Sequence, residues 1–216
     1  SAQVDPSAQT REQPMFHLGE HLMLLYGRGQ LGLDDDQGLL RRFLTDSHPD
    51  IRRHAVGFVG RRMEGEEEVP KEVVDRLMIL WNLYWNGKGR DDAEERPEQP
   101  LFGAWFASGC FPQQWALERL EDFVTVAPLA QPDHGVAERL AKTCEVDIAR
   151  AVRILDRMVQ ADREGWRISG WSDPAREVLK KAMGAGGEAR SQAEQLINYL
   201  GRRGYAEFGA LLNVGP

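Results

Sequence analysis

Apolar residues recur at helical spacing along most of this chain, and that spacing constrains the fold more than any other feature. In the segment 145–161, four of them are Ile148, Val152, Leu155 and Val159. Intervals of three and four residues place these side chains on one face of an α-helix. The segment 70–85 is apolar almost all round, which is typical of a central helix. Because no run alternates strictly between apolar and polar residues, the sequence predicts an all-α fold.

Prolines and capping residues mark where the helices begin. Pro70 and Pro112 stand at expected helix starts, where the missing N–H group carries no penalty. Ser47 forms a capping-box pattern with Asp50, and Ser172 precedes a similar start. Periodicity and breakers together predict helices near 14–28, 34–45, 49–63, 70–86, 101–109, 113–127, 133–143, 145–161, 173–183, 188–201 and 205–212.

One helix start has the composition of a known repeat. Residues 49–55 read P-D-I-R-R-H-A, and weaker echoes begin at Asp147 and Asp173. From about residue 34 onward, the pattern resembles HEAT and armadillo repeats. The resemblance implies a HEAT-like stack of antiparallel helix pairs, and the uneven period makes it an irregular α-solenoid. It also implies a structural arginine that bonds along the stack, a role that Arg52 and Arg176 would take.

The expected organisation is a flexible polar tail at residues 1–12 and a single helical-repeat domain at residues 13–216. A long charged loop at 86–100 interrupts that domain, and loops of this length are either functional or disordered. The start without Met suggests a processed or excised chain. The region 151–212 is similar to C-terminal helical regions of large bacterial multidomain proteins, through residues 161–166 and 200–208. Some of those proteins take part in phage defence, which implies a module of a larger machine.

Composition excludes several classes of function. The net charge of -7 argues against bulk attraction to nucleic acid or to an anionic membrane. The most apolar run, Leu77 to Tyr84, is too short to span a membrane. The two cysteines, Cys110 and Cys144, form neither a metal-binding pair nor a disulfide scaffold. A cytoplasmic location is therefore expected.

The sequence contains no phosphate-binding glycine loop and no nucleophile elbow, but it does contain one pattern found in catalytic sites. His17, Glu20 and His21 fit the H-x-x-E-H pattern of inverted zincins. The two histidines would share one helical face, and Glu95 or Glu98 would supply a third zinc ligand. A zinc-dependent hydrolase is thus the less favoured alternative. Two solvent-facing histidines explain the pattern better, and the sequence predicts no enzyme, no metal and no cofactor.

Arginines and tryptophans supply the candidate binding residues. Arg41, Arg52 and Arg53 could gather on a concave surface that binds nucleic acid, although nearby acids favour solvated salt bridges. Of six tryptophans, Trp166 and Trp171 lie in the linker 161–171 and are the better candidates for a partly exposed surface, although packing in a folded-back corner is favoured even for them. The favoured prediction is a non-catalytic module for protein–protein interaction or scaffolding. Its partner would be a protein or another domain of the same polypeptide, with nucleic acid as the alternative and no membrane.

Overall fold

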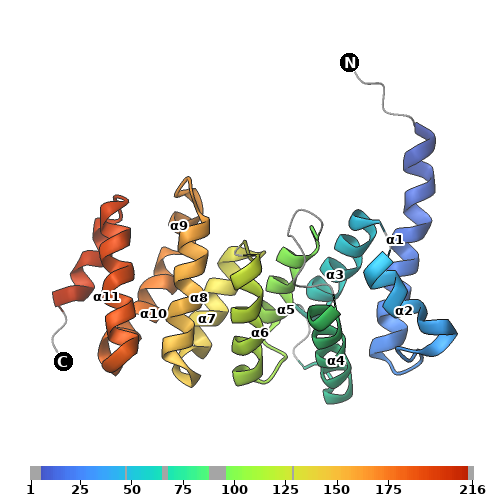
Figure 1. The fold of residues 1–216 in the computed structure, drawn as a ribbon, viewed down its shortest axis with the longest axis horizontal. Helices are drawn as coiled ribbons and strands as arrows, with labels where there is room; N and C mark the ends of the chain where they lie inside the picture. The colour runs from blue at the N-terminus through green and yellow to red at the C-terminus, as the bar shows by residue number, and fades with distance from the viewer. Residues whose placement is uncertain (1–5, 47, 65–67, 88–95, 128, 214–216) are drawn as a thin grey trace. The chain divides into compact units, whose positions relative to one another are not determined.

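The computed structural model of this chain is helical throughout the part that it describes, which is residues 6–46, 48–64, 68–87, 96–127 and 129–213 (Figure 1). Those residues contain no strand, so the predicted all-α class is confirmed. None of the described helices combines the length and the apolar character that a membrane crossing requires. Contacts divide the chain into two compact units, an N-terminal unit, Ser1–Trp105, and a C-terminal unit, Phe106–Pro216.

Helices at the expected positions build the N-terminal unit, in which α1 packs against α3 and α4. Its first helix begins at Pro6, so residues 6–12 are helical where the sequence predicts a flexible tail. The predicted loop at 86–100 ends in a short 3₁₀ helix, while residues 88–95 lie outside the described residues. The elements are α1 (Pro6–Gly27), α2 (Asp35–Asp46), α3 (Pro49–Glu64), α4 (Lys71–Gly87), η1 (Gln99–Leu101) and the start of α5 (Phe102–Ser108).

An aromatic cluster forms the centre of the N-terminal unit. Trp81 of α4 meets Trp105 of α5 edge to face, with ring centroids 5.7 Å apart. Phe102 lies 5.2 Å from Trp81 and 5.0 Å from Trp105, within the range of favourable aromatic pairs. The Trp105 indole donates a hydrogen bond to the backbone carbonyl of Val56 in α3, at 3.0 Å. This bond satisfies the only polar atom of a fully buried ring and fixes α5 against α3.

The contact between α3 and α5 requires a glycine at position 60. A Cβ atom at Gly60 would lie 2.6 Å from the Cβ of Ala104, and neither atom can rotate away. We therefore expect Gly60→Ala to lower the free energy of unfolding by about 1–3 kcal/mol, although alanine is the better helix former. A Cβ atom at Gly184 would meet nothing within 4 Å, so Gly184→Ala should raise that free energy by about 0.5 kcal/mol. Urea unfolding of both variants measures these shifts. A change of the same sign in the free energy of unfolding of both variants would contradict the expectation.

Two rows of helices build the C-terminal unit (Figure 1). One row is α6, α8 and α11, and the second is α7 and α10, with α10 packed against α7, α8 and α11. The short helix α9 lies in the segment that the sequence treats as a linker, and the last element is a 3₁₀ helix. The elements are α6 (Gln113–Val126), α7 (Asp133–Thr143), η2 (Cys144–Val146), α8 (Ile148–Ala161), α9 (Trp166–Gly170), α10 (Ser172–Ala185), α11 (Gly187–Arg202) and η3 (Ala206–Asn213).

Charged side chains join two helices of the first row. Arg150 and Arg153 of α8 both donate to the carboxylate of Glu121 in α6, at 2.7 and 2.6 Å. Partial burial raises the pKa of Glu121, but the hydrogen bonds from Arg153 and Arg150 outweigh it and hold that pKa below its ordinary value. Arg176, by contrast, pairs with Asp173 of its own helix, at 3.0 Å. The α6–α8 pair thus fixes one wall of the surface described next.

Candidate functional site

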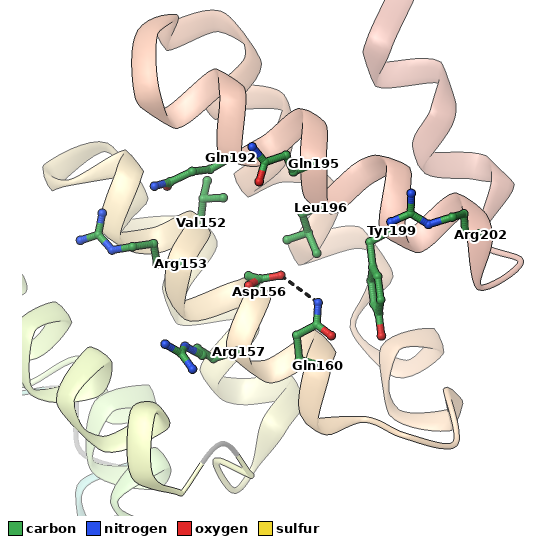
Figure 2. A pocket seen from close by; sticks show the side chains of 10 residues that line it. All are labelled: Val152, Arg153, Asp156, Arg157, Gln160, Gln192, Gln195, Leu196, Tyr199 and Arg202. Carbon is green, nitrogen blue, oxygen red and sulfur yellow. Dashed lines mark hydrogen bonds between the residues drawn. The ribbon is translucent and has the colours of Figure 1, made fainter.

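A groove of about 480 Å³ lies between α8 and α11, entirely within the C-terminal unit (Figure 2). Both helices contribute residues at intervals of three and four positions, as one face of a helix does. The lining residues are Val152, Arg153, Asp156, Arg157 and Gln160 from α8, and Gln192, Gln195, Leu196, Tyr199 and Arg202 from α11.

The amphipathic pattern of α8 explains why the groove is polar. One stripe of α8 is buried in the unit, including Ala151, Ile154 and Leu155. The stripe beside it carries charged and amide side chains and faces α11 across the groove. Val152 of α8 and Leu196 of α11 stand where the two stripes meet, and both are buried. The groove therefore has polar walls, and the two apolar residues at its floor are only 1% and 2% exposed.

Two exposed arginines stand on opposite sides of the groove. Arg157 extends from α8, and Arg202 from the end of α11 (Figure 2). Among the described residues, neither guanidinium has an ion pair or a side-chain hydrogen bond. Arg153 differs, because its guanidinium is already bound to Glu121. Arg157 and Arg202 are therefore the arginines of this groove that can bind an anionic group without first leaving a partner.

The middle of the groove contains acceptors rather than cations. The carboxylate of Asp156 accepts a hydrogen bond from Gln160, at 3.3 Å (Figure 2). Gln192 donates its amide N–H to Glu188 at 2.7 Å, while its carbonyl oxygen is enclosed and has no hydrogen-bond partner in the described part of the chain. Tyr199 lies beside Arg202 in the view, and the Arg203 guanidinium is 5.8 Å from its ring centroid.

The chemistry of the lining suits recognition. Its ten residues include one carboxylate, Asp156, and one phenol, Tyr199, but no histidine, cysteine, serine or lysine. The other polar residues supply guanidinium donors and amide donors and acceptors. Such groups can hold a flexible chain by its backbone and its side chains together.

The predicted arginine surface is different in the structure, because Arg52 lies in the interior. Arg52 is only 5% exposed, and its guanidinium donates to the buried carboxylate of Glu98 at 2.7 Å. Arg53 is exposed on α3, and Arg41 pairs with Asp34 at 3.1 Å. The expectation that Arg52 contributes to an exposed surface is therefore corrected, since its charge is neutralised inside the unit.

The tryptophan surface is also corrected. Trp171 is 2% exposed and belongs to the core of the C-terminal unit, so it offers no ring to a partner. The side chain of Trp166 lies outside the described residues. The backbone of this segment folds back as a compact corner around Asp162, whose carboxylate accepts hydrogen bonds from three backbone N–H groups.

The zincin-like residues pair with one another and with a neighbouring helix. Glu20 lies 3.5 Å from His17 and 2.7 Å from His54 of α3, while His21 bonds to the backbone of His17. Burial raises the pKa of Glu20, but the hydrogen bonds from His54 and His17 bring it below its ordinary value. In the part of the chain that the structure describes, no three His, Cys, Asp or Glu side chains are placed to hold a metal ion. Glu98 lies against Arg52, and Glu95 is outside that part.

Sequence reasoning missed the groove, although its residues carry a visible signal. Arg153, Asp156, Arg157 and Gln160 form a polar stripe along α8, beside the apolar stripe that predicts the helix. That pattern alone marks an exposed helix face, which is ordinary. The groove exists because α11 presents Gln195 and its neighbours to the same stripe, and sequence spacing does not reveal which helices pair.

Comparison with family models, with curated proteins and with solved structures finds no match for this chain.

Proposed function

We propose that this chain is a non-catalytic helical-repeat module for protein–protein interaction or scaffolding, and that the α8–α11 groove is its binding surface. The proposal includes a HEAT-like stack and a place within a larger bacterial multidomain protein. The two rows of helices in the C-terminal unit support the stack, because HEAT-type repeats pack their helices in two layers. Such modules bind extended segments of partners along the grooves between helices.

The observation that carries the proposal is a pair of exposed arginines in the groove that have no ion pair among the described residues. The guanidinium of Arg153, on the same helix as Arg157, is bound to the carboxylate of Glu121. Arg157 and Arg202 are exposed and have no ion pair among the described residues. A surface that combines guanidinium donors with amide donors and acceptors suits a peptide segment of a partner protein.

Selection from a random-sequence peptide library tests this function without assuming the chemistry of the partner. Enriched peptides should bind the wild-type chain and a Lys180→Trp variant equally, because Lys180 is exposed on α10 outside the groove. Gln195→Trp places a large ring in the groove and should weaken the same peptides about tenfold, measured by fluorescence anisotropy.

Two results would contradict the proposed function. One is the failure of any peptide, whatever its composition, to be enriched over the library background. The other is equal binding of the enriched peptides to the wild-type chain and to Gln195→Trp. Circular dichroism of both tryptophan variants establishes that the helical content is the same, so that lost binding is assigned to the groove.

A further inference from the structure

We propose that the α8–α11 groove binds a short acidic segment of a partner protein, with carboxylates at Arg157 and Arg202. This inference rests on the proposed function and adds the chemistry of the partner. Arginine guanidinium groups bind carboxylates through paired N–H donors, which gives both affinity and orientation. Two arginines on opposite sides of one groove therefore favour two separated carboxylates on one chain.

The middle of the groove restricts where those carboxylates can lie. Asp156 repels an acidic side chain placed at the centre, because its own carboxylate faces the groove (Figure 2). The same oxygens can accept N–H groups from the backbone of a bound peptide. Val152 and Leu196 beneath are 1% and 2% exposed, so the floor offers almost no apolar surface to a bound side chain. The expected segment therefore carries two acidic residues separated by an uncharged one.

The charge balance favours an acidic peptide over a nucleic acid. Nucleic-acid surfaces neutralise many phosphates at once, and their affinity grows with the number of cations in contact. This groove offers two arginines that have no ion pair among the described residues and opposes them with Asp156. In the described part of the groove, a polyanion would find only these two cations without an ion pair, whereas a short peptide places its few carboxylates only at those positions.

The experiment compares three labelled probes by fluorescence anisotropy. The first is a short peptide with glutamates on both sides of a central leucine, the second replaces each glutamate by glutamine, and the third is single-stranded DNA of the same length. The acidic peptide should bind more tightly than both other probes. Its affinity should fall as salt rises, because exposed charge pairs are screened.

Variants of opposite expected sign sharpen the test. Arg157→Gln and Arg202→Gln should each weaken the acidic peptide about threefold to fivefold, and together about tenfold or more. Asp156→Asn keeps the shape of the side chain, removes the repulsion and should strengthen binding about twofold. Arg163→Gln removes an exposed arginine outside the groove, changes the net charge equally and should leave binding unchanged.

The outcomes separate this inference from the proposed function. Tighter binding of the glutamine peptide, with the loss on Gln195→Trp retained, overturns the acidic partner and leaves the peptide groove standing. Tighter binding of the DNA, reduced by the two arginine variants, overturns the acidic partner in favour of nucleic acid. If Arg163→Gln weakens binding of the acidic peptide as much as Arg157→Gln or Arg202→Gln does, the acidic partner is also overturned, since the effect would then follow the net charge of the chain. If no peptide binds at all, the function itself fails.

Discussion

Replacing Arg52 by methionine is expected to lower the free energy of unfolding by about 3 kcal/mol, a large effect for a single polar residue. Glu98 is fully buried and its carboxylate accepts hydrogen bonds from Arg52 at 2.7 Å and from Tyr84 at 2.9 Å. Burial and the neighbouring Glu98 raise the pKa of Tyr84 far above its ordinary value, so the hydroxyl stays protonated as a donor. Without Arg52, the buried carboxylate keeps only Tyr84 and the more distant Arg96, at 3.7 Å, among the described residues.

Arg53→Met is the matched control, because Arg53 is the next residue on α3 and is exposed. It should change the free energy of unfolding by less than about 0.5 kcal/mol in the same urea titration. The double variant Arg52→Met/Glu98→Leu should recover part of the loss, since it removes the uncompensated charge together with its partner. Equal stability of Arg52→Met and Arg53→Met would show that the buried pair does not hold the N-terminal unit together.

Helices were readable from the sequence because local physics determines them. The periodic apolar residues of 145–161, the proline at position 49 and the glycines after residue 183 each act within a few positions. The observed α3, Pro49–Glu64, and α7, Asp133–Thr143, begin at the predicted residues. Helix α9 was missed because no apolar period builds it. The carboxylate of Asp162 stabilises this helix by accepting hydrogen bonds from three backbone N–H groups, and a helix of five residues is too short to show an apolar period.

Side-chain partners were not readable, because they join residues far apart in the sequence. The repeat resemblance implies a structural role for Arg52 but does not name its partner, which is Glu98, 46 residues later. The groove depends in the same way on α11 packing beside α8. A count of charges in the sequence does not distinguish Arg153 from Arg157. In the structure, the carboxylate of Glu121 binds the guanidinium of Arg153 and not that of Arg157. Which cations stay unpaired is therefore a tertiary property, and it is the property on which the proposed function rests.

Asp162→Ala is expected to lower the free energy of unfolding by about 3 kcal/mol, because it removes the acceptor around which the 161–171 corner folds. Its buried carboxylate accepts the N–H groups of Gly165 at 3.1 Å, Arg167 at 2.9 Å and Ile168 at 3.0 Å. Alanine leaves these donors without that acceptor, and the Ile168 N–H is buried. Thermal unfolding measures the loss, and hydrogen exchange should accelerate at the Arg167 and Ile168 amides in particular.

Glu164→Ala is the matched control, since Glu164 is an exposed acid in the same corner, and its removal should change the free energy of unfolding by less than about 0.5 kcal/mol. Asp162→Asn keeps one acceptor oxygen and should fall between the two. Because Trp171 packs in the core directly after α9, loss of the corner should also loosen the segment that precedes α10. Unchanged exchange at Ile168 in Asp162→Ala would mean that Arg203 and Tyr205, which bond to the backbone of Arg163 and Gly165, hold the corner instead.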